Sequence, residues 1–182
     1  MNWSDIPRFP NIHYRVNTPW QDIVKTMERY VGEYGLNLDP DFQRGHVWTE
    51  AQQISYVEYM LREPQSGRDI FFNHPNWMGN WEGEFVLVDG KQRLEAARRF
   101  VQNEIPAFGH FAKDIPLTSE KGSKTKIPYS IDFVFNVAKL KTKADVLQWY
   151  IDFNAGGTPH SSKEIERVKE LLAKERASNG KR

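Results

Sequence analysis

The chain has 182 residues, a formal charge of +1 at pH 7 and no cysteine. The missing cysteine excludes disulfides, thiolate catalysis and cysteine-bound zinc or iron–sulfur centres, and the near-neutral charge means that any nucleic acid must be met by a local basic patch. The length suits a single domain over residues 1–182 with a core at about 12–172, and 13% aromatic residues argue against disorder. Without a signal peptide or a long apolar run, we expect a soluble, cytoplasmic protein with no membrane partner.

Strands and helices are predicted in an irregular order along the chain. Alternating or buried apolar runs predict strands at residues 12–16, 68–72, 84–88 and 129–137. Apolar stripes of helical period predict helices after residue 18, from 50 to near 64, at 91–103, from 142 to 151 and from 162 to 172, followed by a tail that is expected to fray. Because the two types do not alternate regularly, the order indicates a mixed α/β or α+β class and not a doubly wound sheet.

Capping boxes, in which a threonine or serine precedes glutamine or glutamate by three residues, predict three helix starts. The pairs are Thr18 with Gln21, Thr49 with Gln52, and Ser161 with Glu164. Gly35 is expected to end the first helix. In the helix at 91–103 we expect Leu94, Ala97 and Val101 to face the core and Glu95 to pair with Arg99 at i,i+4.

Two cations stand in the first turn of that helix. In VLVDGKQRLEAARRF the apolar run stops at Asp89 and Gly90, and Lys91 and Arg93 follow at once. A helix N-terminus already carries a partial positive charge, so these cations need compensation. Either Asp89 neutralises them or caps the helix, or the amides and cations together receive an anion such as a phosphate, beside which Asp89 would orient water or a metal-bound nucleotide.

A second polar cluster, PDFQRGHVW, places Gln43 and Arg44 shortly before a predicted helix. The guanidinium fork of Arg44 could bind a phosphate or a carboxylate of a ligand. The alternative is a structural ion pair with a nearby carboxylate, namely Asp39, Asp41 or Asp89.

A third cluster, DFNAGGTPHSSKEI, lies between the last two predicted helices. Asn154 offers a donor and an acceptor, and Gly156 and Gly157 permit a close backbone approach to a ligand. The same residues also suit a plain connection between two helices, so the cluster alone leaves both interpretations open.

The remaining polar and aromatic residues carry weaker signals. The five histidines show no zinc-site spacing, so no metal held by protein ligands is expected. The six tryptophans are typical core or rim anchors, although HPNWMGNW could line a ligand cleft. The segment KDIPLTSEKGSKTKIP is a polar, lysine-rich loop that we expect to be mobile.

In this order and spacing, the segments LDPDFQRGHVW, VLVDGKQRLEAARRF and IDFNAGGTPHSSKEI resemble a known domain family. It is the family found in the N-terminal half of GmrSD-type modification-dependent restriction enzymes, related to the ParB/sulfiredoxin fold, and the resemblance covers residues 12–172. It implies an α+β domain, a small mixed sheet flanked by helices with further helices at the C-terminus. It also implies a nucleotide-phosphate pocket where the DGQQR-type turn meets the QR segment.

The resemblance assigns residues by position. Nucleotide binding falls to Gln43, Arg44, Gly90, Lys91, Arg93, Asn154, Gly156 and Gly157, and catalysis to Asp89, Gln92 and Arg93. The implied function is NTP hydrolysis on or near DNA, in restriction or phage–host conflict, with the nucleotide as cofactor and Mg²⁺ carried by its phosphates.

Departures from the family pattern keep two rivals open. Lys91 replaces the usual first glutamine of DGQQR, and the His-Asn-His nuclease segment does not follow in this sequence. These departures favour a binding module without turnover, which would contact DNA or a host or phage protein through Arg98, Arg99, Lys121, Lys124 and Lys126. A Mg²⁺- or Mn²⁺-dependent DNA nickase is a third option. Sulfiredoxin chemistry requires a cysteine and is excluded, and no helix-turn-helix supports a ParB role.

Overall fold

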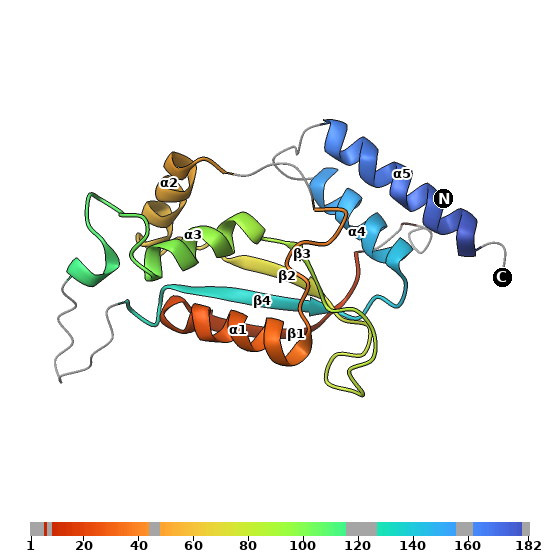
Figure 1. The fold of residues 1–182 in the computed structure, drawn as a ribbon, viewed down its shortest axis with the longest axis horizontal. Helices are drawn as coiled ribbons and strands as arrows, with labels where there is room; N and C mark the ends of the chain where they lie inside the picture. Colours follow the sequence, from red (N-terminus) through yellow and green to blue (C-terminus); the bar gives the residue numbers. More distant parts are fainter. Residues whose placement is uncertain (1–5, 7–8, 44–47, 116–126, 156–161, 180–182) are drawn as a thin grey trace.

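The computed structural model describes residues 6, 9–43, 48–115, 127–155 and 162–179 (Figure 1). In chain order the elements are β1 (Ile12–Pro19), the 3-10 turn η2 (Trp20–Asp22), α1 (Ile23–Tyr34), α2 (Glu50–Met60), β2 (Asp69–Asn73), β3 (Val86–Asp89), α3 (Lys91–Val101), η3 (Ala112–Asp114), β4 (Asp132–Ala138), α4 (Lys143–Ala155) and α5 (Ser162–Asn179). The α+β class expected from the sequence is confirmed.

The four strands form one mixed sheet in the order β1-β4-β2-β3. β4 pairs antiparallel with β1 and parallel with β2, and β2 pairs antiparallel with β3. Every residue of β4 is buried, as expected of a central strand with a helix layer and strand neighbours around it. The predicted strand is therefore confirmed, although it begins at Asp132 and not at residue 129, with Phe133, Phe135 and Val137 in the main core.

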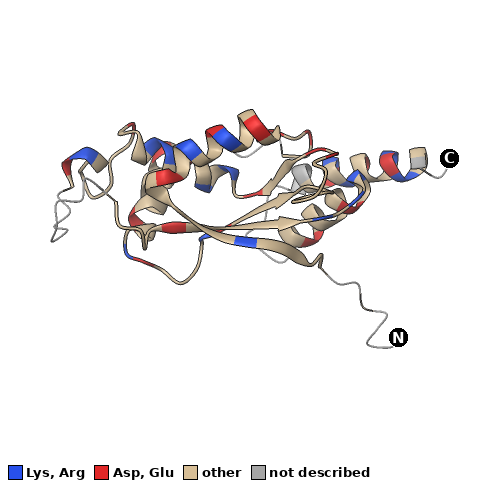
Figure 2. Cartoon of the chain, turned by 90° about the horizontal axis from the view of Figure 1, so that it is seen from below, with Lys and Arg blue, Asp and Glu red and all other residues tan. Residues whose placement is uncertain are grey.

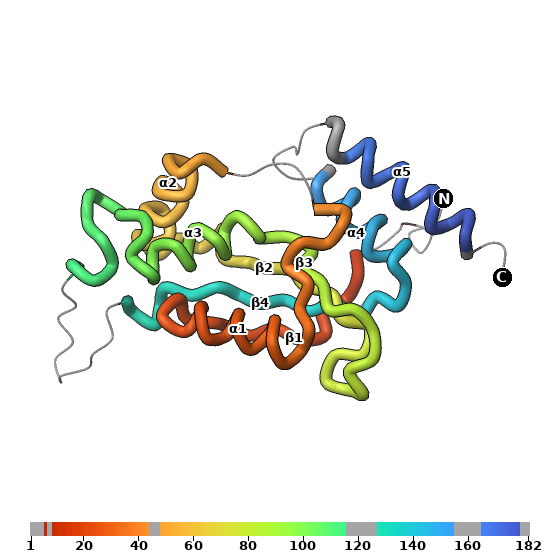
Figure 3. Tube along the Cα trace, viewed as in Figure 1, coloured from red at the N-terminus to blue at the C-terminus, as the bar shows by residue number. Residues whose placement is uncertain are grey.

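Helices cover the sheet on both faces. On one face Phe72, Phe133 and Phe135 pack with α1, α2 and α3 into the larger core. On the other face Phe71 and Val88 pack against α4 and α5, which lie side by side in Figure 3. Each fully buried large apolar side chain contributes about 1.5–3 kcal/mol, so these two cores hold β3 and the following turn from both sides.

Helix starts follow the capping predictions only in part. The Thr49–Gln52 box is present, and Gly35 ends α1 in the left-handed conformation with φ 65°. The prediction for Thr18 is wrong, because β1 continues through Pro19 and α1 begins at Ile23 without a side-chain cap. Pairing with β4 takes the backbone of Thr18 into the sheet before a helix can start. Ser161 lies outside the described residues.

The charged side chains of α3 pair differently from the prediction. Arg98, not Arg99, binds Glu95, while Arg99 reaches Glu50 on α2 and Glu104 beyond the helix. Tertiary neighbours therefore outweigh the expected i,i+4 pair. The expected core face is correct at Leu94 and Ala97, whereas Phe100 is fully buried and Val101 only partly so. At the C-terminus the expectation of a fraying tail is wrong as far as residue 179, because α5 runs on to Asn179 and Arg176 there still donates to Gln148 of α4 at 3.0 Å.

The segment HPNWMGNW is anchored to the core by His74 and Trp77, while its second half is exposed. Trp77 is buried and contacts Tyr30 and Tyr34, and Trp81 stacks on Tyr34 with ring centroids 4.8 Å apart. Its tryptophans thus fix the β2–β3 connection against α1, as anchors do.

His74 in this segment gives the fold an acid-sensitive point. Its side chain is 1% exposed, and burial lowers the pKa of His74 below its ordinary value of 6.5. Nδ1 accepts a hydrogen bond from the Asn76 amide at 3.1 Å, which requires that this nitrogen be unprotonated. The neutral ring therefore contributes stability above pH 6.5 that is lost as pH falls through the lowered pKa.

Urea unfolding at about pH 7.5 and about pH 5.5 is the corresponding measurement. The free energy of unfolding should fall more for the wild type than for His74→Asn, which has no ring to protonate. The exposed His13→Asn serves as control and should lose as much as the wild type. Equal losses in all three proteins would contradict the role of His74.

Candidate functional site

The turn between β3 and α3 requires a glycine. Gly90 has φ 110°, and a Cβ there would lie 2.5 Å from Cδ1 of the buried Ile70. The turn therefore presses the start of α3 against β2 and leaves backbone without a side chain at its tip. No side chain caps α3, so the alternative in which Asp89 N-caps the helix is wrong.

Arg93 folds back over the turn and forms an ion pair with Asp89. Both side chains are 21% exposed, so the pair is largely removed from water. This bond uses one Nη group, and the other donors of Arg93 have no partner in the described part of the chain. The pair thus leaves a guanidinium edge for a second acceptor.

Lys91 donates to Asp39 at 2.8 Å, with the two side chains 37% and 68% exposed. Together with the Arg93–Asp89 pair, this contact gives each first-turn cation a carboxylate partner. The charges that the sequence left unexplained are compensated within the protein. The Lys91 pair is a surface contact worth about 0–1 kcal/mol, so a stronger anion could displace it.

Gln43 and Trp48, on either side of 44–47, are hydrogen bonded to residues next to this turn. Gln43 donates from Nε2 to the Val88 carbonyl at 2.5 Å, and Gln92 accepts the Trp48 amide at 3.0 Å. The Oε1 atom of Gln43 is buried and has no hydrogen-bond partner among the described residues. Arg44 lies outside the described residues, and the chain enters and leaves its segment beside the predicted pocket.

Helices α4 and α5 hold Asp41 and Phe42, which come just before Gln43, in place. Phe42 packs on Tyr150 with ring centroids 5.3 Å apart, and Arg167 donates to the carbonyls of Asp41 and Phe42 at 2.6 and 3.0 Å. Figure 3 shows this stretch passing β3 toward α4. Neither Arg167 nor the Asp39 pair with Lys91 was identified from the sequence, since neither has a local sequence signal.

The side-chain amide of Asn154 is occupied within its own helix. The side chain is buried and donates to the Tyr150 carbonyl one helical turn earlier at 2.7 Å. Next to it, Phe153 packs on Phe71 at 4.8 Å, and Phe71 is the strand partner of Asp89. The described end of the third motif is thus brought to β2, the strand that pairs with β3. Gly156 and Gly157 lie outside the described residues.

Tyr56 of α2 is a neighbour of the ion pair that the sequence did not reveal. Its hydroxyl donates to the Gly67 carbonyl at 2.8 Å, and its ring contacts Trp48 with centroids 5.3 Å apart. Burial raises the pKa of Tyr56 well above its ordinary value, and the nearby Arg93 opposes this only in part. The phenol of Tyr56 therefore stays neutral and acts as a hydrogen-bond donor beside the Asp89–Arg93 pair.

The residues expected to bind DNA carry acidic partners where they are described. Arg98 binds Glu95 and Glu104, and Arg99 binds Glu50 and Glu104. Figure 2 shows basic and acidic segments alternating along the helices. This part of α3 offers phosphate groups little net charge. Lys121, Lys124 and Lys126 lie outside the described residues.

A cavity opens beside residues 37–42, which lie next to β3. It has a volume of about 530 Å³, and its walls include Asp39, Phe42, Val86 and Lys143. Lys143 donates to Asp41 at 2.8 Å across one side of it, and this hydrogen bond raises the pKa of Lys143. The cavity has room for a group larger than a phosphate next to Asp39, the partner of Lys91.

Within the described residues, no helix is long and apolar enough to cross a membrane, and no group of three or more His, Asp or Glu side chains could hold a metal ion. Comparison with protein-family models, with curated proteins and with solved structures found no match. The chain's own residues and geometry therefore carry the functional argument.

Proposed function

We propose that this chain is a nucleotide-phosphate-binding domain with a ParB/sulfiredoxin-like fold, related to the N-terminal domain of GmrSD-type enzymes, and that it hydrolyses NTP on or near DNA in restriction or phage–host conflict. The observation that carries the proposal is that the first and second motifs are hydrogen bonded to each other on either side of the glycine turn, while the third motif reaches the neighbouring strand β2. Gln43 binds Val88, Gln92 binds the amide of Trp48, and Phe153 packs on the strand partner of Asp89.

The energetics at the turn favour an incoming phosphate. Displacing Asp39 from Lys91 costs about 0–1 kcal/mol, whereas a charge-assisted hydrogen bond to a phosphate contributes about 1.5–3 kcal/mol. Arg93 can keep Asp89 on one Nη group while its remaining donors meet the phosphate. The first backbone amides of α3 have no partner within the helix and, as at other helix N-termini, can donate to an anion. Gly90 has no side chain, so the ligand can approach the backbone.

The residues then take distinct roles. Lys91 and Arg93, with Arg44 from the adjoining segment, hold phosphate oxygens, and Asp89 uses the oxygen that Arg93 leaves free to orient water or a phosphate-bound Mg²⁺. Gln92 keeps the Trp48 end of the loop at the pocket through its side-chain oxygen. Asn154 and the Gly156–Gly157 stretch would close the remaining side. The nucleotide itself would supply the phosphoanhydride bond that is cleaved.

Titration calorimetry with ATP, GTP and CTP tests this assignment. Arg93→Ala is expected to weaken binding at least about tenfold, because a charged contact is lost. Arg93→Lys should recover only part, since lysine lacks the planar fork. Arg29→Ala removes the same charge from the exposed surface of α1 and should bind as the wild type does. Equal heats for wild type and Arg93→Ala would end the assignment.

A binding module without turnover is the second candidate, and the ion pairs favour it. Lys91 and Arg93 already have acidic partners, and Lys91 stands where the family has glutamine. Phosphate release from NTP, measured with and without DNA, separates the two candidates. DNA binding through phosphates should also weaken steeply as salt rises, so a salt-independent affinity would exclude the DNA form of this candidate. Intact supercoiled plasmid after incubation with Mg²⁺ or Mn²⁺ would remove the nickase option.

A further inference from the structure

The cavity beside residues 37–42 adjoins the proposed phosphate site. Asp39 lines this cavity and also accepts from Lys91 at 2.8 Å, so a phosphate on Lys91 would lie next to the side of the cavity that Asp39 forms. The volume of about 530 Å³ falls within the range of about 300–1,000 Å³ that is typical of small-molecule sites. A single phosphate would leave most of this space empty, which makes it available to the sugar and base of a nucleotide.

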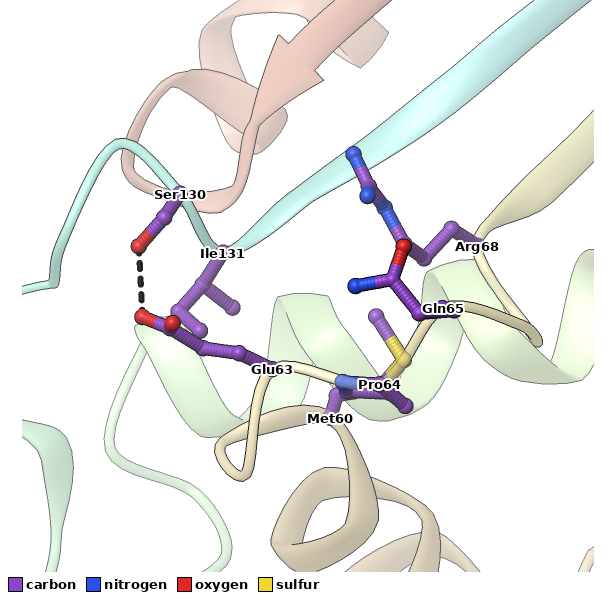
Figure 4. Close-up of a pocket in the computed structure, with 7 residues that line it drawn as sticks. All are labelled: Met60, Glu63, Pro64, Gln65, Arg68, Ser130 and Ile131. Atoms are coloured by element: carbon purple, nitrogen blue, oxygen red, sulfur yellow. Dashed lines mark hydrogen bonds between the residues drawn. The ribbon is translucent and has the colours of Figure 1, made fainter.

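A second cavity, drawn in Figure 4, does not compete for this role. It lies where the end of α2 meets the starts of β2 and β4, and its lining includes Glu63, Arg68 and Ser130. Its volume of about 170 Å³ is below the range that is typical of ligand sites. It also shares no lining residue with the cavity beside residues 37–42, so it is not an extension of the proposed phosphate site.

Part of the lining of the larger cavity is apolar and held in place. Phe42 is 2% exposed, and Val86 and Val146 are each 5% exposed, all within the core cluster that lies under α4 and α5. Phe42 is fixed by ring contact with Tyr150 and by Arg167, which donates to its carbonyl. A fixed apolar surface suits the face of a nucleobase, because little side-chain freedom is lost when the base packs against it.

Most of the polar lining is already occupied by other parts of the protein. Asn73 exchanges two hydrogen bonds with the backbone of Leu140, at 3.1 and 2.8 Å. Asn37 donates to Glu84 at 3.0 Å and accepts from the Asp39 amide at 2.9 Å. Both asparagine side chains thus use a donor and an acceptor within the protein. They position their neighbours and leave ligand recognition to the carboxylates.

Glu84 is the carboxylate best placed to accept from a ligand. It lines the cavity, its side chain is exposed, and only one of its oxygens has a partner among the described residues, the uncharged amide of Asn37. Asp41 also lines the cavity, but Lys143 donates to it at 2.8 Å, and this cation weakens Asp41 as an acceptor. An ionised oxygen that faces no cation forms the stronger hydrogen bond with an uncharged donor.

Charge narrows the class of group that this cavity takes. The charged side chains that line it or pair with its lining balance in number. They are Asp39, Asp41 and Glu84 with Lys91, Lys141 and Lys143. A further anion would be repelled by Glu84 and a further cation by the lysines, so an uncharged hydrogen-bond donor is favoured. Sugar hydroxyls are such donors, and a carboxylate that accepts from a ribose hydroxyl is a common device in dinucleotide-binding proteins.

We propose that this cavity holds the ribose and base of the nucleotide, and that Glu84 selects ribose by accepting a hydrogen bond from its 2′- or 3′-hydroxyl. The base packs on the apolar lining at Phe42 and Val146, while Lys91 and Arg93 hold the phosphates. This inference rests on the proposed function and extends it, because it names a ribonucleotide as the ligand and Glu84 as the residue that determines specificity for the sugar.

Titration calorimetry tests the proposal with ATP, GTP and CTP, each compared with its 2′,3′-dideoxy analogue, and with inorganic tripolyphosphate as a probe that has no sugar. For the ribonucleotide that binds best, the wild type should bind the dideoxy analogue about tenfold more weakly, because a hydrogen bond to a charged group is lost. Glu84→Ala should bring this ratio close to one and leave the affinity for tripolyphosphate unchanged. Glu82→Ala removes an exposed carboxylate outside the cavity lining and should keep the wild-type ratio.

The results that contradict this inference differ from those that contradict the nucleotide site itself. Equal affinities of the wild type for ribonucleotide and dideoxynucleotide, or a ratio that Glu84→Ala leaves unchanged, would overturn the role of Glu84. In that case, weaker binding of tripolyphosphate by Arg93→Ala would still support the phosphate site. If neither nucleotides nor tripolyphosphate bind, both proposals fail. If Glu84→Ala weakens tripolyphosphate binding as well, Glu84 supports the fold and does not select the sugar.

Discussion

Replacing Gly90 by alanine is expected to lower the free energy of unfolding by about 2–5 kcal/mol. At φ 110° a side-chain-bearing residue is strained, which costs about 1–2 kcal/mol. The new Cβ would also lie 2.5 Å from Cδ1 and 3.2 Å from Cγ2 of Ile70, which is fully buried and cannot move aside without disturbing the core. Overpacking of this kind costs about 1–3 kcal/mol more.

Gly35 supplies the matched control for this prediction. It also has a positive φ, 65°, but a Cβ there would meet nothing within 4 Å. Gly35→Ala is therefore expected to cost about 1 kcal/mol from backbone strain alone. Urea unfolding of both variants isolates the Ile70 contact as the difference between them. Equal losses would show that the turn does not depend on close packing of Gly90 against β2.

The same comparison bears on the proposed nucleotide site. Gly90→Ala is expected to shift the first amides of α3 relative to β3. Gly35→Ala changes only the C-terminal end of α1 and leaves the amides of α3 in place. If the amides of this turn hold the phosphate, Gly90→Ala should lose nucleotide affinity under conditions where it remains folded, and Gly35→Ala should keep it.

Local patterns were sufficient for much of the fold. The period-two run in β4 and the Thr49–Gln52 box are confirmed because each depends on residues a few positions apart. Gly35 likewise ends α1 in the left-handed conformation, as its position predicted. Thr18 failed because a partner strand more than a hundred residues away outweighed its local capping signal.

The site was harder to predict because its contacts are long-range. Asp39 with Lys91 and Arg167 with the Phe42 carbonyl join residues 52 and 125 positions apart, and no local pattern encodes either contact. The sequence raised the question of charge in the first turn of α3 and offered two answers. The structure shows a carboxylate beside each cation. Asp89 lies four residues before Arg93, as one of the two answers expected, whereas Asp39 reaches Lys91 only because the sheet brings 37–43 next to β3.

Arg68→Met is expected to destabilise the fold by about 3–5 kcal/mol, because it leaves the buried carboxylate of Asp132 without its cation. The side chain of Asp132 is 8% exposed, and Arg68 is the cation that compensates it, with Asn17 as a second donor. Adding Asp132→Asn removes the orphaned charge while keeping an acceptor for Asn17, so the double variant should regain a large part of the loss.

The Arg15–Asp69 pair lies on the same sheet but is 67% and 40% exposed, with 3.7 Å between Nη2 and Oδ1. Arg15→Met should therefore cost at most about 1 kcal/mol in the same urea-unfolding measurement. A double variant no more stable than Arg68→Met would mean that the lost packing of the arginine stem, and not the charge of Asp132, determines stability at this point of the sheet.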